Sequence, residues 1–254
     1  MIKFVQARRG QFMVFDNDRY VGRSLIELGE FCEEQAVFFT SLLKPDAIVV
    51  EVGANIGAHT VVLAKKAAYV YAFEPQRRVY NVLCGNMALN ELDNVECHRI
   101  AGGERRGIVN MMVLDFSVDN NFGAMSLDNK APEGAADPTP VEPITIPCDL
   151  MKIDVEGWEM QVLRGAEPMI RHCKPVLYVE NDRKDRSNDL ISLIRSFGYK
   201  AYWHKTRLFN PENFHGVKTD PFDGACSHDM LCLPADVQFD VFPEAQLMPV
   251  LEAA

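Results

Sequence analysis

Short apolar runs alternate with amphipathic stretches through the middle of the chain. The runs predict strands at 47–52, 69–73, 95–100, 149–154 and 175–181. Between two of them, apolar positions recur at helical spacing from Val79 to Leu89, and Pro75 suits the start of that helix. This alternation of strand and helix predicts an α/β fold with a mostly parallel sheet and helices on both of its faces.

Further elements follow from the same patterns. A helix is expected from about Ile26 or Glu30 to Leu43, ended by Pro45. Two more helices are expected at 58–66 and at 158–165, the second with Gly165 as its C-cap. A strand is expected at 107–114. Residues 115–147 are rich in Gly, Pro, Asn and Asp, so we expect a long irregular loop, above all at 131–140, whose near side at 122–126 helps to shape a substrate pocket.

The turn after the first buried run carries the clearest chemical signal. Gly53 and Gly57 flank Asn55 between a strand and a helix, and Glu74 ends the next strand about twenty residues further on. A dinucleotide fingerprint would have glycines at relative positions one, three and six, and this turn lacks two of them. The compact turn resembles the first motif of class I S-adenosylmethionine-dependent methyltransferases, in which no pyrophosphate needs a cradle. Glu51 and Glu74 support this interpretation, because they can meet an ammonium and two ribose hydroxyls.

Carboxylates also gather where later strands end. Asp154 and Glu156 follow one buried strand, and Glu180 ends the next. In open parallel sheets ligands bind at this edge, so we interpret these three as candidates for a general base or for orienting a methyl acceptor. A structural role for Asp154, such as capping the turn, stays open. His59, after the glycine turn, is either a further base or a residue of the first helical turn.

Composition limits the partners. The chain has 254 residues, 48% of them hydrophobic, which suits one globular unit, and its net charge of −10 argues against nucleic acid as a partner. The first residues lack the apolar run of a signal peptide, and no stretch is long enough for a membrane span, so we expect a cytoplasmic protein. Seven scattered cysteines are expected to be reduced. Cys226, His228 and Cys232 do not have the spacing of a zinc site, so no metal is predicted.

The motifs together resemble the FkbM-type S-adenosylmethionine-dependent methyltransferases of class I. The resemblance rests on Glu51 to Gly57, on Ala72 to Pro75, on Leu150 to Ala166 and on Asp229 to Pro234, and it extends over most of the chain. Glu51 stands where the family often has Asp, which keeps the carboxylate. The resemblance implies a Rossmann-like sheet of seven strands. Its last two strands form an antiparallel hairpin, here 200–204 and 228–233, joined by a long excursion.

The same resemblance and the motifs divide the chain and assign its residues. Residues 1–46 are expected to form an N-terminal helical cap on a methyltransferase domain at 47–254. The residues assigned to the cofactor are Glu51, Gly53, Ala54, Asn55, Gly57, Thr60, Glu74, Pro75, Ala101 and Asp154; those assigned to catalysis are Asp154, Glu156 and Glu180.

The implied reaction is O-methylation of a hydroxyl on a sugar or secondary metabolite by in-line displacement. The acceptor is expected to be a small molecule or glycan, and a homodimer is possible. Transfer to a peptide or small-molecule nitrogen, an NAD-dependent oxidoreductase and a non-catalytic cofactor-binding protein remain alternatives.

Overall fold

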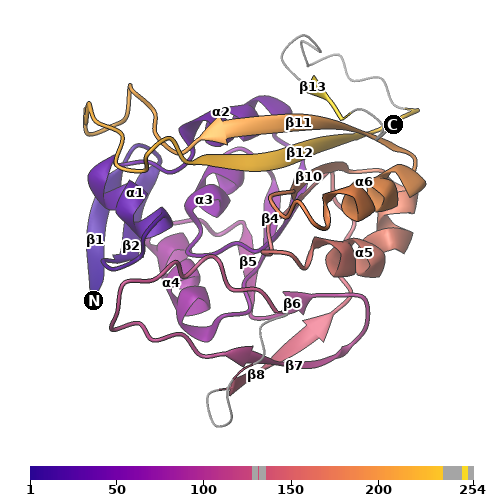
Figure 1. The fold of residues 1–254 in the computed structure, drawn as a ribbon, viewed down its shortest axis with the longest axis horizontal. Coiled ribbons are helices and arrows are strands. Elements are labelled where there is room, and N and C mark those ends of the chain that lie inside the picture. Colours follow the sequence, from indigo (N-terminus) through magenta and orange to yellow (C-terminus); the bar gives the residue numbers. More distant parts are fainter. Residues whose placement is uncertain (128–130, 132–135, 237–247, 251–254) are drawn as a thin grey trace.

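A twisted central sheet organises the molecule (Figure 1). The computed structural model describes residues 1–127, 131, 136–236 and 248–250. The strand order is β13-β11-β12-β10-β9-β3-β4-β5. The strands are β3 (Ile48–Val52), β4 (Tyr69–Phe73), β5 (Val95–His98), β9 (Leu150–Ile153), β10 (Val176–Glu180), β11 (Tyr199–Arg207), β12 (Cys226–Pro234) and β13 (Met248–Pro249).

Strand directions confirm the predicted class I arrangement. The strands from β5 to β10 are parallel, β12 is antiparallel to β10, and β11 pairs with β12 as an antiparallel hairpin. The two-residue β13 adds an eighth strand beyond the expected seven, at the outer edge of β11. The sheet therefore presents the carboxyl ends of β3, β4, β9 and β10 along one edge.

Helices cover both faces of the sheet because side chains alternate along each buried strand. Met151 and Leu177 face a core that includes residues of α5 and α6, whereas Leu150 and Tyr178 face a core that includes residues of α2 and α3. The helices are α1 (Val21–Glu27), α2 (Glu33–Leu42), α3 (Ala58–Ala64), α4 (Arg77–Leu89), α5 (Glu159–Cys173) and α6 (Ser187–Ser196). Among the described residues, no helix combines the length and apolar character needed to cross a bilayer.

Two helix predictions differ from the structure at one end. The helix expected from about Ile26 or Glu30 to Leu43 is confirmed as α2, but it begins only at Glu33, because Cys32 before it adopts a left-handed backbone conformation; the preceding α1 was not predicted. The expected end at Gly165 is also wrong, since α5 continues to Cys173. A Cβ at Gly165 would lie 2.0 Å from the carbonyl oxygen of Gly103, so this glycine permits a close approach of backbone inside the helix instead of capping it.

A small second sheet corrects the prediction for the long loop. It contains β6 (Ala101–Gly102), β8 (Ala136–Glu142) and β7 (Gly107–Met112) in that order. The expected irregular segment 131–140 is therefore wrong for 136–140, while 132–135 lie outside the described residues. In β8, β6 pairs with Val141 and Glu142 and not with Pro138 or Pro140. The two prolines lack an N–H, and on this edge of β8 no strand pairing requires one from them.

An N-terminal hairpin, which was not predicted, packs against the main fold. It consists of β1 (Ile2–Ala7) and β2 (Gly10–Phe15). The Asn86 side chain of α4 fixes it, because its Oδ1 accepts from the Met13 N–H at 2.6 Å and its Nδ2 donates to the Met13 carbonyl at 3.1 Å. The first residues thus pack on the sheet-bearing part of the chain. The domain division at residue 46 stays a prediction.

Candidate active site

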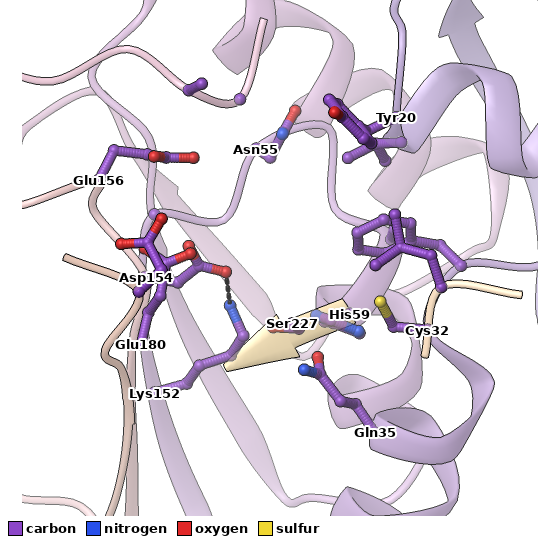
Figure 2. A pocket seen from close by; sticks show the side chains of 18 of the residues that line it. Tyr20, Cys32, Gln35, Asn55, His59, Lys152, Asp154, Glu156, Glu180 and Ser227 are labelled. Carbon is purple, nitrogen blue, oxygen red and sulfur yellow. Dashed lines mark hydrogen bonds and ion pairs between the residues drawn. The ribbon is translucent and has the colours of Figure 1, made fainter. Parts of the chain in front are cut away.

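A cavity of about 450 Å³ opens at the carboxyl ends of β3, β4, β9 and β10. Figure 2 shows Asp154, Glu156 and Glu180 on one side of it and Tyr20 and Cys32 on the other. Eight of the predicted site residues line it: Glu51, Gly53, Ala54, Asn55, Glu74, Asp154, Glu156 and Glu180. The structure therefore brings together most of the residues that the sequence singled out.

The glycine turn forms one wall of the cavity. Gly53 has a φ of 87°, and a Cβ there would lie 1.8 Å from the carbonyl oxygen of Asp154, so only glycine lets the end of β3 pass so close to the end of β9. Gly57 also has a φ of 87°, but it does not line the cavity. A Cβ on Gly57 would meet Met87 of α4 at 2.7 Å, so its contact is with the protein itself.

Glu74 is held in place by backbone N–H groups. It is buried, its Oε2 accepts from the Asn55 N–H at 3.0 Å, and its Oε1 accepts from the Gln76 N–H at 2.8 Å. Burial raises the pKa of Glu74 to about 7, although both N–H groups act to lower it. Each carboxylate oxygen can accept a further hydrogen bond, so the group can still receive hydroxyls from a ligand.

An adjoining hollow contains two more of the predicted cofactor residues. Pro75 and Ala101 line it together with Trp158, and it shares Gly53 and Glu74 with the main cavity. The indole N–H of Trp158 donates to the Gly102 carbonyl at 3.1 Å. Apolar side chains and backbone dominate this hollow, which suits a flat heterocycle next to Glu74.

Under the glycine turn lies a buried ionic cluster that the sequence analysis only partly predicted. Thr60 donates to Glu51 Oε2 at 2.6 Å, and Lys152 Nζ lies 3.6 Å from Glu51 Oε1 and 3.1 Å from Asp154 Oδ2. Glu51, Thr60 and Lys152 are each at most 2% exposed. Burial raises the pKa of Glu51, whereas the charges of Asp154 and Glu51 outweigh burial and raise that of Lys152. Glu51 is therefore already engaged inside the protein.

A second wall of the cavity, formed by Glu156, Glu180 and Asp182, is acidic. Carboxylate oxygens of Glu156, Glu180 and Asp182 lie within 4.8 Å of one another. Arg183 pairs with Glu156 at 3.0 Å and with Asp182 at 3.4 Å, while Glu180 Oε2 is buried without a partner among the described residues. Burial, followed by the charge of Asp154, raises the pKa of Glu156 to about 8 and raises that of Glu180 well above its ordinary value.

Several lining residues come from parts of the chain that carried no recognisable motif. Tyr20, Phe31, Cys32 and Gln35 belong to the N-terminal segment, and Ser227 belongs to β12. Only the helix expected to end at Leu43 pointed to this segment, and it gave no role to Tyr20, Cys32 or Gln35. Lys152 was also missed as a functional residue; its signal was a lysine inside an otherwise apolar run, two residues before Asp154.

Charge and open hydrogen-bonding capacity show that the cavity fits S-adenosylmethionine. Six acidic residues line it, Glu51, Glu74, Asp154, Glu156, Glu180 and Asp182, against two basic ones, Lys152 and Arg183. The cofactor carries a sulfonium and an ammonium, which suit a lining in which acidic residues outnumber basic ones. In the described part of the chain, Glu180 Oε2 and His59 Nε2 are buried and lack partners, which leaves hydrogen-bonding capacity for a ligand.

Comparisons with known proteins agree with this assignment. The family model described as "Methyltransferase FkbM domain" matches residues 51–201. A fungal protein named "Methyltransferase 1", from Beauveria bassiana (strain ARSEF 2860), is 27% identical over 150 residues, which is 48% of this chain. The match covers only 59% of that relative's length.

Solved structures give the fold. A precorrin-6y C5,15-methyltransferase from Geobacter metallireducens GS-15 is similar over 79% of this chain and 88% of that one, with a TM-score of 0.52 and 13% identity. The methyltransferase FkbM from Methylobacillus flagellatus KT is 17% identical over 76% of this chain and 47% of that one, with a TM-score of 0.45.

The fold is that of the class I methyltransferases, as the sequence predicted. Because the FkbM model matches more than half of the residues, the chain belongs to the FkbM methyltransferase family.

Proposed function

We propose that the protein transfers the methyl group of S-adenosylmethionine to a hydroxyl of a small molecule or glycan. The observation that carries the proposal is the group of carboxylates beside the glycine turn, where Glu156 and Glu180 have raised pKa values and Glu180 Oε2 lacks a partner among the described residues. When bound, S-adenosylmethionine supplies an electrophilic methyl group on a sulfonium that becomes a neutral thioether.

On the cofactor side, the predicted residues have distinct tasks in this proposal. Glu74 accepts the ribose hydroxyls, since backbone N–H groups already fix the direction of its carboxylate. Gly53, Ala54 and Asn55 give the ligand a close backbone surface. Pro75 and Ala101 contact the adenine in the adjoining hollow. Thr60 donates a hydrogen bond to Glu51, and Gly57 allows the turn to pack closely against α4. Both residues therefore support the site from outside the cavity.

The side of the cavity that carries Glu156 and Glu180, here called the acceptor side because the methyl acceptor would bind there, supplies a general base. A hydroxyl becomes a better nucleophile as its proton passes to a general base within hydrogen-bond reach. Glu156 and Glu180 suit this task because burial raises the pKa of Glu156 to about 8 and raises that of Glu180 well above its ordinary value, which makes each carboxylate a stronger base. Asp154 is ion-paired with Lys152 at 3.1 Å, so it suits orientation and charge better than proton transfer.

Most of the remaining catalysis would come from alignment. Holding nucleophile, methyl carbon and sulfur in line in a site that excludes water lowers the barrier without a covalent intermediate. The net charge of −10 and the acidic lining support a neutral acceptor, such as a sugar or secondary metabolite, over a nucleic acid. A homodimer and a cytoplasmic location remain predictions.

The test combines binding with an acceptor screen. Methyl-labelled S-adenosylmethionine would be incubated with the protein and with panels of hydroxyl-bearing glycans, phenolic and polyketide metabolites, and amines, and methylated products would be identified by mass spectrometry. Label on oxygen that depends on Glu156 or Glu180 would support the proposal. Label found only on nitrogen would replace it with the alternative of N-methylation.

A further inference from the structure

The part of the cavity lined by Lys152, His59 and Ser227, here called its floor, contains a buried cation, Lys152, with one N–H donor that lacks an acceptor in the described part of the chain. Lys152 is 2% exposed and lines the cavity. Its ammonium has three N–H donors. It pairs with Asp154 at 3.1 Å and with Glu51 at 3.6 Å, and the charge of the buried Asp229 acts on it as well. No third acceptor contacts it among the residues that the structure describes. A buried ammonium is costly to maintain, so a free donor that faces a cavity points to a ligand.

His59 lies on the same floor, and Lys152 is close enough to affect the pKa of the His59 imidazole. It is 6% exposed, lines the cavity, and its Nε2 has no partner within the described residues. Burial lowers the pKa of His59 well below its ordinary value, and the charge of Lys152 lowers it further, so the ring is neutral and retains one N–H. Figure 2 shows His59 and Lys152 on the side of the cavity where Ser227 lies.

The other side chains of this floor are already engaged within the protein. The Phe31 and Phe39 rings lie 5.3 and 5.4 Å from the imidazole of His59, measured between ring centroids. Gln35 and Ser227 both donate to Asp229 behind the cavity, at 2.7 and 2.6 Å. Asp154, with a side chain that is 36% exposed, is the most open carboxylate beside Lys152. A cation and an anion therefore stand side by side at the end of the cavity.

We propose that this pair recognises the α-amino acid end of the cofactor: Lys152, assisted by His59, binds the methionine carboxylate, and Asp154 binds the adjacent ammonium. The inference rests on the proposed function and assigns roles that the sequence alone did not give. It moves the ammonium contact from Glu51, which Thr60 and Lys152 already engage, to the more open Asp154. The site would then select the intact amino acid over analogues that lack its carboxylate.

Calorimetric titration with two ligands tests the inference directly. The wild-type protein would be titrated with S-adenosylmethionine and with decarboxylated S-adenosylmethionine, which keeps the sulfonium and the amine but lacks the carboxylate. A hydrogen bond between charged groups implies that the intact cofactor binds about 10- to 100-fold more tightly. Equal affinities for the two ligands would overturn the inference.

Variants then assign the preference to Lys152. Lys152→Met alone leaves Glu51 buried beside an apolar chain, so the double variant Glu51→Gln/Lys152→Met, which removes both charges, is measured as well, with circular dichroism as the check on folding. Lys200→Met on the exposed face of β11 is the control. We expect the double variant to bind both ligands within about threefold of each other, while the control keeps the preference.

The outcomes separate the inference from the proposed function. A double variant that still prefers the intact cofactor by tenfold would show that another group holds the carboxylate, and the inference would be wrong although the cofactor is bound. A wild-type protein that binds neither ligand, nor S-adenosylhomocysteine, would overturn the proposed function and the inference together.

Discussion

The two sides of the cavity differ in how their carboxylates are held. On the cofactor side, Glu74 receives two backbone N–H groups, and Glu51 receives Thr60 and Lys152. On the acceptor side, Glu180 Oε2 has no partner among the described residues, and Glu156 pairs with an Arg183 side chain that is 43% exposed. One side has carboxylates fixed by several donors of the protein, and the other has carboxylates that the protein holds less completely, which suits the proposed roles in binding and in proton transfer.

The largest expected effect tests the acceptor side. Glu156→Gln and Glu180→Gln keep the shape of each side chain but remove the base, so we expect at least one of them to lower turnover by about 100- to 10,000-fold. Binding of S-adenosylhomocysteine should change by less than about threefold, because neither residue contacts the cofactor in this account. Steady-state kinetics and calorimetry measure the two quantities.

Asp185→Asn is the control for this pair, since Asp185 is an exposed carboxylate, with a side chain 80% exposed, that does not line the cavity. Full turnover in both glutamine variants would remove the distinction between the two sides, because the acceptor side would then contribute shape alone.

A glycine substitution tests the rigidity of the cofactor side. Gly53 and Gly198 have nearly equal φ values, 87° and 86°, but a Cβ at Gly53 would lie 1.8 Å from a backbone oxygen, whereas a Cβ at Gly198 would meet nothing within 4 Å. Both alanine variants carry the left-handed strain, and only Gly53→Ala adds the clash. We expect it to lower the free energy of unfolding by about 1 to 3 kcal/mol more than Gly198→Ala.

Chemical denaturation of the two variants measures this difference. If both were destabilised equally, the backbone at the end of β9 would have moved away, and the cofactor side would be more adaptable than its hydrogen bonds indicate.

The pH dependence of turnover tests whether Glu156, on the acceptor side, takes the proton. Burial and the charge of Asp154 raise the pKa of Glu156 to about 8, so the carboxyl is protonated and inactive as a base below that pH. Turnover should therefore fall about tenfold for each pH unit below 8 and level off above it. A rate profile under cofactor saturation measures this dependence. A profile that is flat from pH 6 to 9 would show that no such carboxyl takes the proton.

The smallest expected effect concerns metal ions. Glu156, Glu180 and Asp182 are close enough for a cation, but Arg183 already offers a positive charge to two of them. Treatment with EDTA should therefore change turnover by less than about twofold, in line with the absence of a metal site from the sequence prediction. Loss of activity that added Mg²⁺ restores would give the acceptor side a metal and change its mechanism.

The sequence predicted the wall formed by the strand ends better than the wall that faces it, for a physical reason. A buried strand, a glycine turn and a carboxylate at the end of the next strand are local features, so Gly53 and Glu74 could be read from short stretches. The walls that face them come from distant segments: Tyr20 and Gln35 precede the first central strand, and Ser227 lies in the last long one. Nothing local in their sequence indicates which cavity they meet.

The elements that were predicted wrongly depend on tertiary contacts. Gly165 reads as a helix C-cap by local rules, but it lies inside α5 because the backbone of Gly103 passes against it. Strand β8 contains Pro138 and Pro140, which local rules assign to a loop, yet it pairs with β7 along its length. In both cases a neighbour far along the chain decided the structure, and propensity alone could not.

The most direct test of the account is calorimetric titration of S-adenosylmethionine into the wild-type protein and the Glu74→Ala variant, with the exposed Glu96→Ala as control. The account predicts a dissociation constant on the order of micromolar for the wild type and the control, weakened about 100-fold in Glu74→Ala by the loss of the carboxylate and of the two N–H contacts that fix the loop. Equal affinity in all three proteins, or no binding by the wild type, would contradict it.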